Sequence, residues 1–125
     1  MKPKSLSKVS TEDLRTMYEE AAALHGQASK EGAHRTANAQ YKRIITTWKE
    51  LRSRGEAGRE ALVQSMGSSN PHVRSWAASH VLEFDPRSAE AELERLANGP
   101  PSIVRLDAEM TLKEWRAGNL KFTDS

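Results

Sequence analysis

Residues 68–82 read SSNPHVRSWAASHVL, and a second version of this stretch, NGPPSIVRLDAEMTL, occupies residues 98–112. In both, a turn that contains proline precedes a Val-Arg pair, and Val73-Arg74 lies 31 residues before Val104-Arg105. Asn and Pro are favoured at the start of a helix, because the Asn side chain accepts backbone N–H groups and Pro needs no partner in the first turn. Each stretch therefore predicts a turn and then the second helix of a hairpin. We expect Val to face the core and Arg to reach turn carbonyls or an adjacent carboxylate.

The rest of the chain shows the same helical pattern. Apolar residues recur at the spacing of a helix face and predict further helices over residues 10–31, 34–53, 56–66 and 86–97, with a last one over 102–117. Leu24, Tyr41 and Val63 are among the residues expected to be buried. No segment alternates with a period of two, so the sequence predicts an all-α protein of about six helices. A repeat of 30 to 50 residues made of paired helices is typical of an α-solenoid.

Residues 56–117 resemble HEAT-type repeats. In that family a helix rich in Leu and Ala is followed by a turn with Asp or Asn and Pro, and then by Val-Arg. The stretches ALVQSMGSSNPHVRSWAASHVL and AEAELERLANGPPSIVRLDAEMTL match this pattern. With a long first helix and NAQYKRIITTWKELRSRG before them, the layout is similar to a small bacterial HEAT-like family catalogued as a domain of unknown function. The resemblance implies an α-α superhelix of two N-terminal helices and two hairpins, and it implies no catalytic residues.

Length and composition predict one globular domain, since the chain has 125 residues, of which 37% are apolar and 29% charged. We expect a flexible N-terminal tail over residues 1–9, a helical domain over 10–118 and a C-terminal tail over 119–125. The absence of cysteine excludes disulfides, thiolate catalysis and cysteine-ligated zinc. The basic start MKPKSLSKVS has no apolar run behind it, and no stretch approaches the roughly 20 apolar residues of a membrane span, so we expect a cytoplasmic bacterial protein.

The residues that carry chemistry in other proteins form no recognisable motif in this sequence. None of the four histidines has metal-ligand spacing; they are His25, His34, His72 and His80. Glu90, Glu92 and Glu94 alternate, which spreads them around a helix, and we expect them on a solvated face. No phosphate-binding glycine loop or nucleophile elbow is present. The sequence therefore predicts that the protein is not an enzyme and uses no metal or cofactor.

Positive charge gathers in the middle of the chain, where residues 30–59 hold eight basic and three acidic side chains. Arg35, Lys42 and Lys49 recur every seven residues and so lie on one side of the expected helix. Together with Arg43 they form a candidate electrostatic patch. Such a patch is either a solvated helix surface or a contact for the nucleic-acid backbone. The net charge of only +2 favours the solvated surface and makes nucleic acid the less favoured partner.

The last expected helix is apolar on two sides. One stripe contains Val104, Ala108, Thr111, Leu112 and Trp115, and the other contains Ile103, Leu106, Met110 and Ala117. The second stripe is either covered by the tail residues Leu120 and Phe122 or left exposed for a partner. The candidate partner surface comprises Ile103, Leu106, Met110 and Trp115.

These features together favour a non-catalytic protein–protein interaction module. Its partner is another protein or, as an alternative, a second copy of the chain. Two alternative functions stay open. In the first, the protein is an immunity protein that neutralises a bacterial toxin, and in the second it binds the nucleic-acid backbone through the basic side of the second helix.

Overall fold

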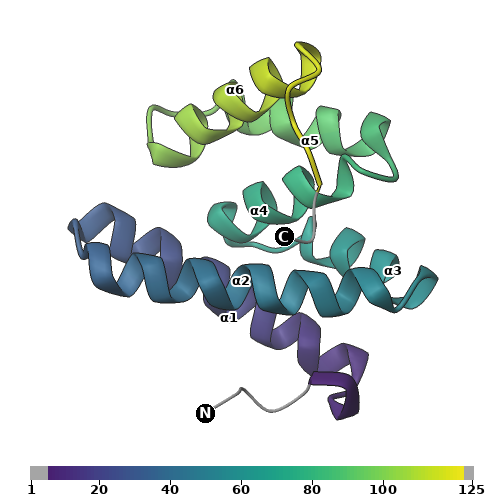
Figure 1. The fold of residues 1–125 in the computed structure, drawn as a ribbon. Helices are drawn as coiled ribbons and strands as arrows, with labels where there is room; N and C mark the ends of the chain where they lie inside the picture. The colour runs from purple at the N-terminus through teal and green to yellow at the C-terminus, as the bar shows by residue number, and fades with distance from the viewer. Residues whose placement is uncertain (1–5, 123–125) are drawn as a thin grey trace. The chain divides into compact units, whose positions relative to one another are not determined.

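The computed structural model describes residues 6–122 and shows an all-α protein (Figure 1). Six α-helices and a short 3-10 turn account for the regular structure of these residues, which contain no strand. The elements are η1 (Leu6–Lys8), α1 (Thr11–Glu31), α2 (His34–Ser53), α3 (Glu56–Ser65), α4 (Pro71–Val81), α5 (Pro86–Ala97) and α6 (Ile103–Arg116). The expected fold class is confirmed, and each helix lies where the apolar periodicity predicts it.

The described chain divides into two compact units, and the division falls within α3, after Ala61. In the first unit α1 and α2 form a long antiparallel hairpin (Figure 1). Gly32 makes the turn between them in the left-handed conformation, with φ of 71°, and its backbone N–H is accepted by α1 carbonyls. Leu14 and Tyr18 of α1 and Ile44 and Leu51 of α2 are completely buried.

At the junction between α2 and α3, the backbone of α3 lies very close to the backbone at the end of α2. The connecting Gly55 has φ of 66°, so the chain can turn within two residues. A Cβ placed on Gly58, in the first part of α3, would lie only 1.7 Å from the carbonyl oxygen of Leu51. Glycine at this position therefore allows α3 to start directly against the end of α2.

The first residues of the described chain correct one expectation. Residues 1–9 are predicted to be a flexible tail, yet Leu6–Lys8 form η1. Arg54 at the end of α2 donates a hydrogen bond of 2.9 Å to the carbonyl oxygen of Leu6 and one of 3.1 Å to the hydroxyl of Thr11. This contact over nearly 50 residues holds η1, and sequence periodicity gives no sign of it. Residues 1–5 lie outside the described part of the chain.

In the second unit α4, α5 and α6 follow one another side by side (Figure 1). Each of the three begins with a side chain that accepts a backbone N–H of its own first turn, and these capping residues are Asn70, Asp85 and Ser102. Ala77, Leu93 and Ala108, one from each helix, are completely buried. Consecutive helices thus pack together within each unit, as in an α-α superhelix.

Three apolar side chains expected inside are exposed. Leu24 is 47% exposed, Tyr41 48% and Val63 41%. Each lies at the border of its helix's apolar stripe, where a change of one residue in register moves a side chain by about 100° around the helix. The periodicity locates the centre of a buried face better than its borders.

Candidate interaction surfaces

The outer side of α6 is an exposed apolar surface. Val104, Ala108 and Leu112 are buried on the side that packs into the second unit. On the opposite side Ile103 is 37% exposed, Leu106 55% and Met110 57%. These three residues, called here the α6 face, are spaced i, i+3 and i+7 and form a continuous stripe. The structure thus separates the two apolar stripes of α6 into a buried one and an exposed one.

Polar contacts hold α6 against α5. The indole Nε1 of Trp115 donates a hydrogen bond of 2.9 Å to Glu90, and the Arg116 guanidinium contacts Glu90 at 3.3 Å and Glu94 at 2.6 Å. Trp115 is therefore half-buried beside α5 and does not belong to the α6 face, contrary to its place in the candidate partner surface. A buried indole N–H usually has a hydrogen-bond acceptor. Which residue is the acceptor depends on tertiary packing, so Glu90 could not be predicted from the sequence.

The described residues after α6, 117–122, leave the α6 face uncovered. The ring of Phe122 meets the ring of Trp115 edge-on, with centroids 6.4 Å apart. Phe122 therefore packs on the Trp115 side of α6. Because Ile103, Leu106 and Met110 are exposed, the alternative in which the tail covers the second stripe is wrong for the described part of the tail. Residues 123–125 lie outside the described residues.

Charged side chains border the α6 face. Arg105 lies 3.6 Å from Glu109 one turn further along α6, so these two charges largely offset each other. Lys113 has no ion pair among residues 6–122, and it borders a shallow open pocket of about 350 Å³ between α5 and α6. Asp107 and Glu114 lie on the other border and are exposed. The face therefore has one border that is mainly acidic.

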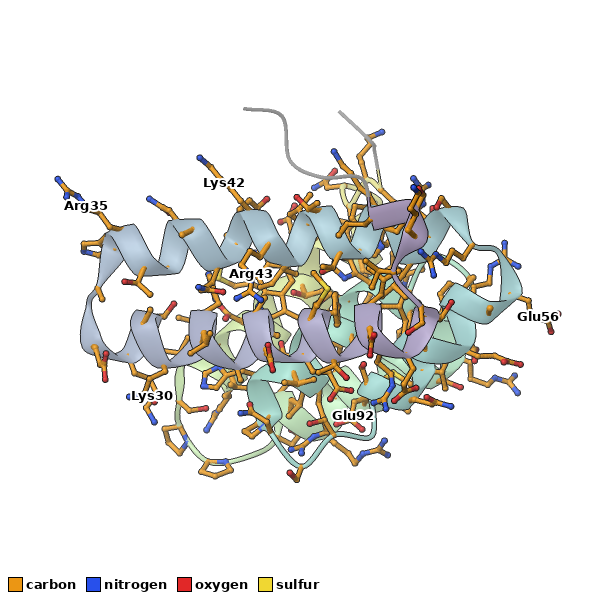
Figure 2. The ribbon with its side chains drawn as sticks, turned by 90° about the horizontal axis from the view of Figure 1, so that it is seen from below. Lys30, Arg35, Lys42, Arg43, Glu56 and Glu92 are labelled. Atoms are coloured by element: carbon orange, nitrogen blue, oxygen red, sulfur yellow. The ribbon has the colours of Figure 1, made fainter. Side chains whose placement is uncertain are left out.

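The expected electrostatic patch is split between two sides of α2. Figure 2 shows Arg35 and Lys42 extending from α2 on the side away from α1, while Arg43 points toward α1. Arg43 is half-buried, hydrogen-bonded to Gln40 at 2.8 Å and 3.9 Å from Glu20 of α1. Lys49 is half-buried and also interacts with other groups. Arg43 is thus separate from the other three residues, which recur every seven positions. Of these three, Arg35 and Lys42 are exposed.

The arginine of each Val-Arg pair makes the same kind of contact, a hydrogen bond to the turn before its helix. Arg74 Nη1 donates to the carbonyl oxygen of Ser68 at 2.8 Å, and Arg105 Nη1 donates to that of Gly99 at 3.4 Å. Each arginine thus reaches back six residues to the turn before its helix, while Val73 and Val104 are buried. The interpretation of Val-Arg as a structural device is confirmed in both copies.

Glu92 corrects the expectation that the acidic residues of α5 are solvated. It is only 8% exposed, and its carboxylate accepts hydrogen bonds from Arg74 Nε at 3.2 Å and Arg95 Nη2 at 2.6 Å. A carboxylate can be buried at this depth because two guanidinium groups supply its hydrogen bonds. Glu90 and Glu94, by contrast, are the acids that bind Arg116.

His80 is a buried structural residue. It is 7% exposed, and desolvation lowers its pKa from 6.5 to about 3, so the imidazole is neutral at pH 7. Its ring lies 5.9 Å from that of Trp76. Within residues 6–122, no three side chains of His, Asp or Glu come together in a way that suits a metal ion. Nor is any helix in this range both long and apolar enough to cross a membrane.

Comparisons with known proteins support the fold. The crystal structure of the protein RPA1889 from Rhodopseudomonas palustris CGA009 superposes with a TM-score of 0.88, covering 97% of this chain and all of that one. The two sequences are 23% identical, so the likeness shows a shared fold and no more. No family model and no curated protein matches the sequence.

Proposed function

We propose that the protein is a non-catalytic, HEAT-like module that binds another protein through the α6 face. The observation that carries the proposal is the exposure of Ile103, Leu106 and Met110 on a helix whose opposite side is fully packed. A helix that is apolar on two sides and covered on one leaves an adhesive surface, and contiguous apolar patches commonly mark interaction sites. The HEAT-like assignment rests on the two Val-Arg pairs, whose arginines bond to equivalent turn carbonyls.

The support beneath the α6 face makes it suitable for binding. The contacts of Trp115 and Arg116 with Glu90 and Glu94 fix the last turns of α6 on α5. The Ser102 hydroxyl caps the first turn by accepting the N–H of Arg105 at 3.1 Å. A surface that is already ordered loses little conformational entropy when a partner binds.

Charge around the α6 face favours another protein over a second copy. In an antiparallel pair of α6 helices, a twofold axis would bring Asp107 and Glu114 of one copy toward the same residues of the other. The arginines of α6 are already held by Glu109, Glu90 and Glu94, so a second copy could supply little beyond Lys113. We propose that the partner presents an amphipathic helix with apolar residues at helical spacing and basic residues along one border.

The experiment begins with a photo-crosslinking amino acid at Met110, introduced in cells that express the protein naturally. The same group at Arg87, an exposed residue of α5, is the matched control. A protein captured only from Met110 is then purified and titrated with the wild type and with the Leu106→Glu/Met110→Glu variant. We expect the variant to lose at least about tenfold in affinity, since buried charges in an apolar contact are strongly unfavourable. Equal binding by the two proteins would contradict the proposal.

Light scattering of the same two proteins tests the alternatives. A monomeric wild type and a folded monomeric variant support a face that is open to another protein. A dimeric wild type with a monomeric variant would show instead that a second copy occupies the face. An unfolded variant would show that Leu106 and Met110 contribute to the core, and the proposal would then fail.

A further inference from the structure

Positive charge on α2 is not neutralised within the helix. Residues 34–53 contain five basic side chains and a single acidic one, Glu50. Glu50 is itself engaged, because Arg54 lies 3.2 Å from its carboxylate. Within α2, therefore, Arg35 and Lys42 have no carboxylate left to pair with.

Arg35 and Lys42 have no carboxylate nearby, unlike most of the other arginines in the described chain. Arg15, Arg74, Arg105 and Arg116, for example, each lie within 4 Å of at least one carboxylate. Within residues 6–122 Arg35 and Lys42 have no such partner, and both are exposed. Figure 2 shows them extending in the same direction, away from α1. These two residues form a free basic row on the outer side of α2. Lys49, one heptad further along, is half-buried and interacts with other groups, so it is not part of the free row.

The spacing of the row suits a helical partner. Residues seven apart on a helix are separated by about 10.5 Å along its axis and lie within about 20° of one another around it. Carboxylates seven residues apart on a second helix that lies alongside would have the same spacing. Affinity for a nucleic-acid backbone, in contrast, arises from many phosphate contacts made at once. Two free cations on one straight helix offer few such contacts, and Tyr41, the exposed aromatic residue of α2, lies about 100° away from the row.

We propose that the outer side of α2 is a second interaction surface, which binds an acidic helix of a partner protein whose carboxylates recur every seven residues. This surface is made of residues in the first unit and does not depend on the α6 face. Because both charges are exposed, the contact is electrostatic and weak in isolation, and it should steer and orient a partner more than it holds one. Its strength should fall as salt rises, because ions screen exposed charges over about 10 Å at 0.1 M ionic strength.

The test uses two fluorescent, alanine-rich helical peptides of identical composition. One carries two glutamates seven residues apart on one side, and the other carries them five residues apart, pointing in different directions. Fluorescence anisotropy at about 20 mM salt, where screening is weak, follows the titration of each peptide with the full-length protein. The Arg35→Glu/Lys42→Glu variant removes the row. The Arg87→Glu/Lys121→Glu variant makes the same charge change at exposed positions of the second unit.

We expect the aligned peptide to bind the wild type at least about fivefold more tightly than the scattered one, as two exposed ion pairs would allow. This preference should disappear in the α2 variant and persist in the control variant. Equal affinity for the two peptides, or no binding of either, would overturn the proposal. Retention of duplex DNA that depends on Arg35 and Lys42, without a preference for the aligned peptide, would also overturn it and assign the row to the nucleic-acid backbone.

Discussion

Replacing Gly58 by alanine should destabilise the first unit strongly. In an ordinary helix this substitution is favourable by as much as 1 kcal/mol, because alanine has the higher helix propensity. Here the added Cβ would lie 1.7 Å from the Leu51 carbonyl oxygen and 2.6 Å from its carbonyl carbon. Both atoms belong to the backbone, so no rotamer change can relieve the contact.

The structure gives the scale of the effect. Contacts of this kind are essentially never shorter than 3.0 Å, so α3 and the end of α2 must separate by at least about 1.3 Å, the difference between 3.0 and 1.7 Å. Overpacking by one methyl group commonly costs about 1–3 kcal/mol of stability. Because the clash here is with backbone atoms that cannot change rotamer, we expect a cost at or above the upper limit of this range. We therefore expect a loss of about 3 kcal/mol or more in the free energy of unfolding, and a fall in Tm of roughly 10 °C.

Urea denaturation followed by tryptophan fluorescence measures the effect, and Gly67→Ala is its control. A Cβ on Gly67 would meet only the Gln64 carbonyl oxygen at 3.4 Å, an ordinary contact, so that variant should be as stable as the wild type or slightly more stable. If Gly58→Ala unfolds at the same urea concentration as Gly67→Ala, the close approach of α3 to Leu51 is not a feature of the folded protein.

Three further substitutions probe the second unit. Glu92→Ala removes the carboxylate that binds Arg74, and we expect a loss of roughly 2–4 kcal/mol by chemical denaturation; a loss below about 0.5 kcal/mol would mean that this buried pair is not formed. Asn70→Ala removes the cap of α4, and thermal unfolding should show a loss of about 1 kcal/mol, with no change in Tm counting against the cap. The pKa of His80 is lowered to about 3 by burial, so the unfolded state binds its proton more readily, and stability declines as pH falls from 6.5 toward 3. His80→Gln should reduce this decline by up to about 1.4 kcal/mol per pH unit, as measured by urea unfolding between pH 6.5 and 4.5, and an unchanged slope would contradict a buried neutral imidazole.

Local signals in the sequence were sufficient for the helices and their ends. Helix capping depends on residues within one turn, so Asn70 could be recognised from its neighbours alone. The two ends of α1 are set in the same local way, by the Ser10 side chain and by Gly32. The two Val-Arg pairs were likewise recognisable, because both arginines bind carbonyls only six residues away. Features of this kind are set by the immediate surroundings of each residue.

Contacts between distant residues could not be predicted in the same way. Glu92 looks like the other acids of α5, and only the approach of Arg74, 18 residues away, makes its burial favourable. Gly58 and η1 were missed for the same reason, since their partners lie on another element. The candidate surfaces were predicted in part. Helical periodicity groups Leu106 with Met110 and places Trp115 in the other stripe, but it gives no sign that Glu90 accepts the indole N–H of Trp115.

A comparison of the two Val-Arg pairs connects the repeat with the proposed function. Both arginines bind the turn before their helix, but the acid that completes the arrangement differs. Arg74 pairs with Glu92 on the following helix α5, so its guanidinium ties two helices together. Arg105 pairs with Glu109 on its own helix, and among the described residues no helix follows α6. The second Val-Arg pair thus keeps the contact with the turn before its helix, but its arginine makes no ion pair with another helix of the described chain. Under the proposed function, a partner's helix would pack on the α6 face in the way that consecutive helices of an α-solenoid pack on one another.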